Sequence, residues 1–175
     1  PSFSNDYPPI DGVNLLIEKD SSFPNEINGT SVNQGGIVYL NVDLDIANEI
    51  IFANNNAIYT MKSNGDILPP FPLILDTNSI IKWVPTVGDV TGDGIEEIIF
   101  ITQLDTFSKL YSINKNGTIT NGFPVSLNKN TQIPVLADVS NNGTLDIIIG
   151  ENLTDSSSQI NIIDGAGSPL GGFPF

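Results

Sequence analysis

The side chains that could do chemistry in this sequence are oxygen ligands in a short loop at residues 89–97. Four of them alternate along the loop: Asp89, Thr91, Asp93 and Glu97. Three carboxylates packed this closely repel one another at neutral pH unless a positive charge sits between them. Ca²⁺ accepts about six to eight oxygen ligands in a flexible cage, and the backbone carbonyl of Ile95 would supply another. An apolar run follows at once, so the sequence predicts a calcium loop that leads into a buried strand.

Two further features of this loop concern its backbone. Gly94 follows the third ligand position, and glycine permits the positive φ that a chain needs to fold back around an ion. An EF-hand would place a bidentate Glu at its twelfth position, which is Phe100 here. The last acid comes earlier, at Glu97, and β-forming residues follow where an EF-hand needs a helix. The loop is therefore predicted to enter a strand.

The acidic loop occurs three times, and we number the copies in chain order. The first loop offers Asn41, Asp43, Asp45, the carbonyl of Ala47, and Glu49. The second loop is residues 89–97. The third offers Asp138, Ser140, Asn142, the carbonyl of Thr144, and Asp146. Each is predicted to bind Ca²⁺ in a structural role; the alternative is a set of solvated turns, which Asp, Asn and Gly favour in any case.

The three loops differ in how well they fit a cation. In the first loop Ile46 stands where glycine is expected, and a β-branched residue is strained at positive φ. That loop is expected to adopt another turn or to bind weakly. The third loop keeps Gly143 but has only two carboxylates. Affinity for Ca²⁺ decreases when the ligands carry less negative charge, so we rank the second loop first.

A second marker repeats with the loops. Phe-Pro recurs about every 50 residues, at 23–24, 71–72, 123–124 and 173–174, with one loop and one apolar strand between neighbours. Strands are expected at Ile81–Val87, Glu97–Thr102, Lys109–Ile113 and near Ile119–Leu127 of the second period. Four strands in a period near 50 residues are typical of a propeller blade. We predict an all-β fold: a β-propeller segment of four-stranded antiparallel blades.

The predicted organisation is one propeller domain over residues 1–175. It divides into an N-terminal half blade at 10–27 and three full blades at 28–76, 77–127 and 128–175. Each Phe-Pro is expected in an outer strand, with its ring packed between blades. Since propellers usually close with four or more blades, the open edges are expected to pair with the rest of a larger propeller or with another copy.

Composition narrows the function classes. The net charge is −14, with 20 acids against 6 lysines, so nucleic acid and anionic membranes are poor partners. With no His and no Cys, the sequence lacks Ser-His-Asp and Cys-His pairs and the usual zinc ligands. No apolar segment approaches the ~20 residues that span a bilayer. The chain starts at Pro1 without Met or a signal peptide, so we expect a processed or excised polypeptide.

The loops and the strands after them resemble the FG-GAP family of β-propeller repeats, which is found in integrin α-subunit heads and bacterial surface proteins. The best match is the set Asp89, Thr91, Asp93, Gly94 and Glu97. The resemblance implies Ca²⁺ in the loops, an extracellular or cell-surface setting, and a non-catalytic role in adhesion, scaffolding or protein binding. One alternative is a carbohydrate-binding propeller, with Trp83, Tyr39, Tyr59 and Tyr111 as stacking surface. Another is a structural subunit of an extracellular assembly, completed by edge pairing.

Overall fold

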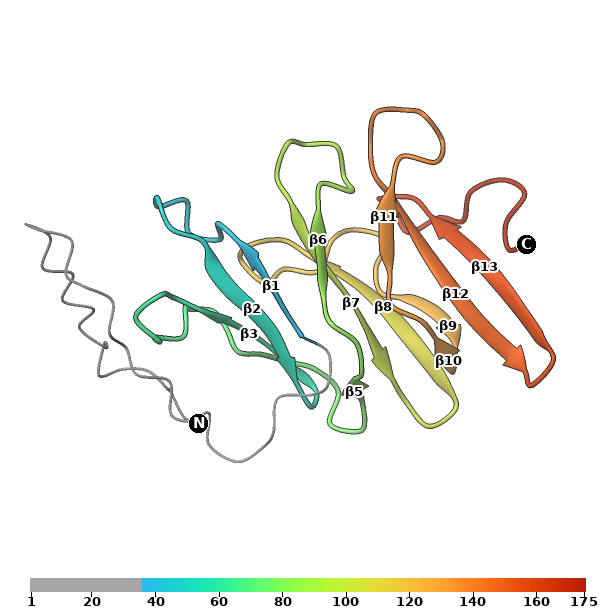
Figure 1. Ribbon diagram of the computed structural model, residues 1–175, viewed down its shortest axis with the longest axis horizontal. Coiled ribbons are helices and arrows are strands. Elements are labelled where there is room, and N and C mark those ends of the chain that lie inside the picture. The colour runs from blue at the N-terminus through green and yellow to red at the C-terminus, as the bar shows by residue number, and fades with distance from the viewer. Residues whose placement is uncertain (1–35) are drawn as a thin grey trace, which may run out of the picture.

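The computed structural model describes residues 36–175, which form three antiparallel β-sheets arranged one after another (Figure 1). This part of the chain contains no helix, and therefore none long and apolar enough to cross a membrane. The all-β prediction is confirmed. The predicted half blade at residues 10–27 and the first Phe-Pro, at 23–24, lie outside the described residues.

Each sheet is built from one period of the repeat. The first sheet has the order β1 (Ile37–Leu40), β2 (Glu49–Asn54), β3 (Ala57–Met61) and β4 (Leu73–Ile74). The second contains β5 (Ile80–Ile81), β6 (Thr86–Gly88), β7 (Glu97–Gln103), β8 (Phe107–Ile113) and β9 (Val125–Asn128). The third contains β10 (Asn130–Thr131), β11 (Val135–Ala137), β12 (Asp146–Thr154) and β13 (Ser157–Ile163). All strand pairs within these sheets are antiparallel.

The first strand of the second period is not the single strand predicted at Ile81–Val87. It is split into β5 and β6, which pair with opposite ends of β7. Pro85 lies between the two pieces, and proline has no N–H to give to the ladder. The third sheet repeats this break at Pro134, between β10 and β11. The proline therefore divides the first strand in both sheets.

The last strand of the period also differs from the prediction. Ile119 makes only an isolated bridge with Ile113, and β9 begins after a turn, at Val125. The Phe-Pro pairs at 71–72 and 123–124 thus stand immediately before β4 and β9, not inside an outer strand, and both peptide bonds are cis. The missing N–H of proline falls where strand pairing has not yet started.

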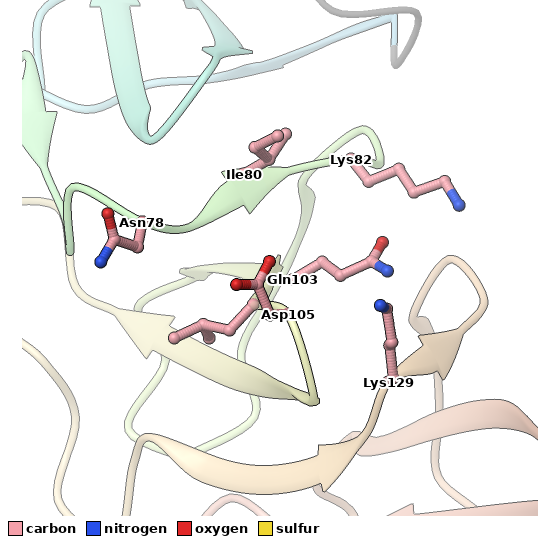
Figure 2. Close-up of a pocket in the computed structure, with 7 residues that line it drawn as sticks. Asn78, Ile80, Lys82, Gln103, Asp105 and Lys129 are labelled. Carbon is pink, nitrogen blue, oxygen red and sulfur yellow. The ribbon is translucent and has the colours of Figure 1, made fainter.

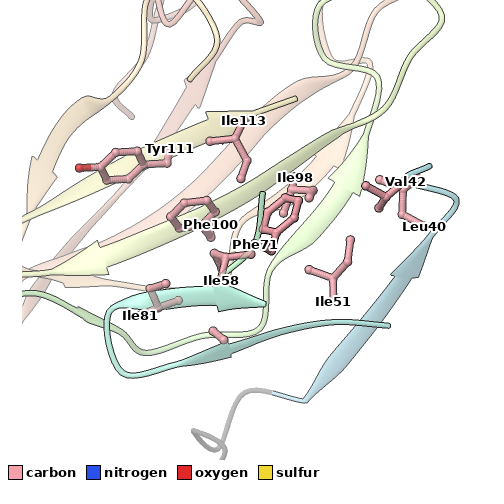
Figure 3. Packing of buried hydrophobic residues seen from close by; sticks show 11 residues of the cluster. Leu40, Val42, Ile51, Ile58, Phe71, Ile81, Ile98, Phe100, Tyr111 and Ile113 are labelled. Atoms are coloured by element: carbon pink, nitrogen blue, oxygen red, sulfur yellow. The ribbon is translucent and has the colours of Figure 1, made fainter. Parts of the chain in front are cut away.

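Two apolar clusters join the sheets. The first lies between the first and second sheets, where Ile51, Ile58 and Phe71 meet Ile98 and Phe100 (Figure 3). The second lies between the second and third sheets, where Ile99, Leu110 and Phe123 pack with Ile147 and Ile163. Successive residues of β7 enter different clusters, because side chains alternate across a strand. A continuous apolar run is what a strand covered on both faces requires.

The expected role of the repeated Phe is confirmed at two positions. Phe71 and Phe123 are both buried, and each belongs to a cluster that spans two sheets. Burial of a Phe side chain between sheets removes large apolar area from water and fixes the spacing of the sheets. Phe173 is half-buried.

A polar contact of a buried carboxylate also joins the second sheet to the third. Glu151 in β12 is 1% exposed, and it accepts hydrogen bonds from the backbone N–H (2.9 Å) and the Nδ2 (2.8 Å) of Asn128. A third donor is Nε2 of Gln159. Asn128 ends β9, so one carboxylate links two sheets.

We expect Glu151→Ala to destabilise the protein by about 2–3 kcal/mol, because it removes a carboxylate that accepts hydrogen bonds from Asn128 and Gln159, and hydrogen bonds to charged groups are the stronger ones. Urea unfolding followed by circular dichroism measures this directly. Asp155→Ala is the matched control, since Asp155 is exposed in the turn between β12 and β13. Equal unfolding midpoints for the two variants would show that the contact contributes nothing.

Candidate metal-binding loops

The three acidic loops occupy equivalent places in the three sheets. They connect β1 to β2, β6 to β7 and β11 to β12, and they project from the same end of the sheets, at the top of Figure 1. In each sheet the last residue of the strand before the loop pairs with the last acid of the loop: Leu40 with Glu49, Gly88 with Glu97, and Ala137 with Asp146. Strand pairing therefore closes every loop at its ninth position.

The ninth-position carboxylates are buried and hydrogen-bonded within their loops. Glu49, Glu97 and Asp146 are at most 3% exposed. Each accepts the backbone N–H of the second loop residue, at 2.8 Å from Val42, 3.0 Å from Val90 and 2.9 Å from Val139. In the second and third loops the same carboxylates also accept the N–H of Thr91 and Ser140. These acids hold the turn together as well as offering oxygen.

The first-position aspartates of the second and third loops have a similar role. Asp89 accepts the N–H groups of residues 92, 93 and 94, and Asp138 accepts those of residues 142 and 143. At the fifth loop position, Oδ1 of Asp93 and Oδ1 of Asn142 each accept the backbone N–H of the residue two positions later. Because all these side chains turn back onto their own loop, their oxygens are gathered over it.

The first loop has a different turn, as Ile46 predicted. All three loops have positive φ at their fourth position, namely Leu44 at 64°, Gly92 at 77° and Asn141 at 54°. At the sixth position Gly94 and Gly143 have φ of 85° and 89°, whereas Ile46 is not in this region. Asn41 correspondingly donates from Nδ2 to the carbonyl of Asp45 and accepts no N–H from the loop. The β-branched residue thus redirects the backbone of the first loop.

The first loop nevertheless has the closest group of acids. Among residues 36–175, Asp43, Asp45 and Glu49 form the one set of three acidic side chains whose oxygens all lie within 4.8 Å of one another. Lys62 forms an ion pair with Asp43 at 2.5 Å. Its hydrogen bond holds the pKa of Asp43 below the ordinary value, and the same contact raises the pKa of Lys62. An ammonium group therefore already neutralises part of the first loop.

In the second loop, the ninth-position carboxylate of Glu97 forms no ion pair with a lysine of residues 36–175. Burial raises the pKa of Glu97, and the N–H groups of Val90 and Thr91 offset this only in part. The neighbouring Glu96 is turned outward and paired with Lys115 at 3.0 Å, a contact that lowers the pKa of Glu96. Lys115 is thus paired with Glu96, which is not one of the candidate ligands of the second loop.

Two buried side-chain oxygens of the loops, among residues 36–175, have no hydrogen-bond partner. Oδ1 of Asp146 is buried and unpaired in a residue that is 0% exposed, while Oδ2 accepts both backbone N–H groups. Oδ1 of Asn41 is likewise buried without a partner. An unsatisfied buried oxygen costs about 1–3 kcal/mol, so these two atoms identify places where a cation would fit.

The aromatic residues proposed as a sugar-stacking surface do not share one site. Tyr111 is 5% exposed and stacks on Phe100 inside the first cluster. The indole N–H of Trp83 donates to the carbonyl of Thr131 at 3.0 Å, and Lys82 lies over the indole ring. Tyr59 stacks on Phe52, and Tyr39 is exposed on β1. Packing and hydrogen bonding within the protein account for three of these four side chains.

Comparison with known families agrees with the geometry. A search of curated proteins found no match. Residues 89–149 match the model of the FG-GAP-like repeat. That span begins at the first residue of the second loop and ends inside β12, so it includes both glycine-containing loops and every buried residue of the second apolar cluster except Ile163. Residues 89–149 therefore carry an FG-GAP-like repeat, as the resemblance of the second and third loops predicted.

Proposed function

We propose that this chain is a calcium-stabilised β-propeller segment that acts outside the cell, or on its surface, as a non-catalytic module for adhesion, scaffolding or protein binding. The FG-GAP-like repeat supports a propeller-type protein-interaction domain. In this proposal the three sheets are consecutive blades, and the three loops carry ions that fix the first turn of each blade. The observation that carries the proposal is the buried, unpaired Oδ1 of Asp146 in a loop built like its neighbour.

The donor set fits Ca²⁺ in each loop. The second loop would hold it with the side chains of Asp89, Thr91, Asp93 and Glu97 and the carbonyl of Ile95. The third would use Asp138, Ser140, Asn142 and Asp146 with the carbonyl of Thr144, and the first Asn41, Asp43, Asp45 and Glu49 with that of Ala47. All these ligands are oxygen atoms, which Ca²⁺ prefers. Mg²⁺ suits them less, since it demands stricter octahedral geometry and retains its waters.

The ion's expected role is electrostatic and structural. Bound Ca²⁺ would neutralise carboxylates that the fold gathers at one end of the sheets and would give the unpaired oxygens of Asp146 and Asn41 a partner. In the first loop it would compete with the ammonium group of Lys62 for Asp43. The first loop is therefore expected to bind more weakly than its three clustered carboxylates alone would indicate.

Thermal unfolding tests the proposal. Millimolar Ca²⁺ is expected to raise Tm relative to chelator, because a ligand that binds only the folded state stabilises it by about 2.7 kcal/mol at a hundredfold excess over Kd. Mg²⁺ at the same concentration should produce a smaller shift. Identical melting curves in Ca²⁺ and in chelator would contradict the proposal.

A single substitution separates metal binding from folding. Asp93→Asn places in the second loop the residue type that the third loop has at the equivalent position, Asn142. The amide oxygen can still accept the N–H of Ile95, so the Tm in chelator should stay the same or rise. The Ca²⁺-induced increase in Tm should shrink, because one ligand charge is lost. Asp155→Asn is the control and should leave both values unchanged.

A second candidate role, as a subunit of a larger assembly, is favoured by the outer face of the third sheet. Ile160 in the third sheet is equivalent to Leu110 in the second. Ile160 pairs with Gly150 and Leu110 pairs with Ile101, and these partners are the fifth residues of β12 and β7. Leu110 is 0% exposed beneath the third sheet, whereas Ile160 is 47% exposed. The third sheet therefore presents the surface that a further blade would cover. Sedimentation should show concentration-dependent association that Ile160→Asn weakens; a monomer at every concentration would contradict this role.

A further inference from the structure

Two lysines differ from the rest in their surroundings. Of the five lysines in residues 36–175, three form ion pairs: Lys62 with Asp43, Lys109 with Asp76 and Lys115 with Glu96. The other two, Lys82 and Lys129, have no carboxylate within ion-pair distance in the described part of the chain. In a protein with 20 acids, both of these lysines line one pocket of about 340 Å³. The pocket is therefore lined by two positive charges in a protein whose net charge is −14.

The pocket is assembled from three segments, two in the second period and one in the connection to the third sheet. Asn78, Ile80 and Lys82 come from β5 and its flanks, Gln103 and Asp105 from the end of β7 and the turn after it, and Lys129 from the connection between β9 and β10. Figure 2 shows the amide of Gln103 and the ammonium groups of Lys82 and Lys129 extending toward the same opening. The pocket volume is within the range of small-ligand sites.

The fold does not require lysine at position 82. Ile81 pairs with Thr102 just as Thr131 pairs with Glu151, so Lys82 is equivalent to Gln132 in the third sheet. Gln132 holds that position with its backbone N–H bonded to the carbonyl of Gly150. A glutamine thus satisfies the same strand geometry, and the one contact that uses the charge of Lys82 within the described residues is with the ring of Trp83, 5.0 Å from its centroid.

The side chains in the pocket indicate the chemistry of its ligand. Two ammonium groups match a carboxylate, for which lysine is a strong point-charge donor. The amides of Asn78 and Gln103 and the carboxylate of Asp105 can bond hydroxyls, while Ile80 offers apolar contact. Asp105 would repel a simple anion but accepts hydrogen bonds from hydroxyl groups. We propose that this pocket binds a sugar acid, with its carboxylate between Lys82 and Lys129 and its hydroxyls toward Gln103 and Asp105.

This site is separate from the acidic loops. Glu97 begins β7 and Gln103 ends it, which places the pocket about 20 Å from the second loop at ~3.3 Å per residue. The proposal therefore stands independently of calcium binding.

Isothermal titration with galacturonate tests it, with galactose as the neutral counterpart and glutamate as a carboxylate without ring hydroxyls. Galacturonate should bind in millimolar Ca²⁺ and equally in chelator, galactose at least about tenfold more weakly, and glutamate also more weakly. Lys82→Gln and Lys129→Gln should each reduce affinity about tenfold, and raised salt should reduce it too. Lys115→Gln is the matched control, since that lysine pairs with Glu96 at the other end of β7, and it should change nothing.

Three outcomes would overturn the proposal. Absence of galacturonate binding removes the site. Equal affinity for glutamate and galacturonate removes the sugar and leaves a simple carboxylate site. Binding that disappears in chelator while surviving both lysine substitutions would show that the sugar acid contacts a metal ion in the loops. Circular dichroism of Lys82→Gln checks that the variant remains folded, as its equivalence to Gln132 leads us to expect.

Discussion

Replacing Phe100 with alanine is expected to lower the free energy of unfolding by about 3–5 kcal/mol. The ring is 0% exposed and lies in the cluster that joins the first and second sheets. It also stacks on Tyr111 with ring centroids 5.2 Å apart and planes 5° from parallel. The substitution removes both the buried area and the stacking partner, and it leaves a cavity between two sheets that cannot fully close.

Denaturant unfolding by circular dichroism and fluorescence measures this loss. Phe100→Leu should cost less than Phe100→Ala, because most of the buried volume is kept. Phe175→Ala is the control, since that ring is 88% exposed, and its unfolding midpoint should match the parent protein. If Phe100→Ala unfolded at the same denaturant concentration as Phe175→Ala, the packing of the sheets described here would be wrong.

The second large effect is expected at Gly165, in the turn after β13. A Cβ added there would lie 1.8 Å from the carbonyl oxygen of Val90 and 3.2 Å from the Cα of Thr91. Both obstacles are backbone atoms, so no side-chain rotation can relieve the overlap. Gly165→Ala should therefore push the third sheet away from the second loop and cost about 3 kcal/mol, the upper end of the usual range for overpacked sites.

A second readout makes this prediction specific. Val90 donates its N–H to Glu97, so displacing Val90 should also disturb the second loop and reduce the Ca²⁺-induced rise in Tm. Gly171→Ala is the matched control, because a Cβ there meets nothing within 4 Å. A Gly165→Ala variant as stable as Gly171→Ala would show that the two segments are not in contact in solution.

The sequence predicts best those strands that are buried on both faces, because a short continuous apolar run is typical of such a strand. The apolar runs of β2, β7 and β12 identify interior strands, and the Asn-Gly and Asp-Gly dipeptides mark turns that follow β3, β8 and β13. What it did not predict is the split first strand. Residues 81–87 are rich in β-forming side chains and are predicted as one strand, but the effect of Pro85 depends on which neighbour its missing N–H would have faced.

The loops show the same division between local and long-range information. Ligand spacing, and the altered turn caused by Ile46, follow from residues close in sequence. The pairing of Lys62 with Asp43 and the contact of Gly165 with Val90 join distant segments, and the pocket at Lys82 and Lys129 requires three. No periodicity encodes such contacts. The predicted ranking of the second loop as the strongest calcium site stays a prediction.

The most direct test of the calcium account is diffraction from crystals grown in millimolar Ca²⁺, with anomalous data to locate the ions. We expect a peak in the second loop among Asp89, Asp93 and Glu97, and one in the third loop in contact with Oδ1 of Asp146. The first loop is expected to show an ion only where Lys62 has turned away from Asp43. Well-ordered loops without anomalous peaks, with Oδ1 of Asp146 bonded to water alone, would contradict the account.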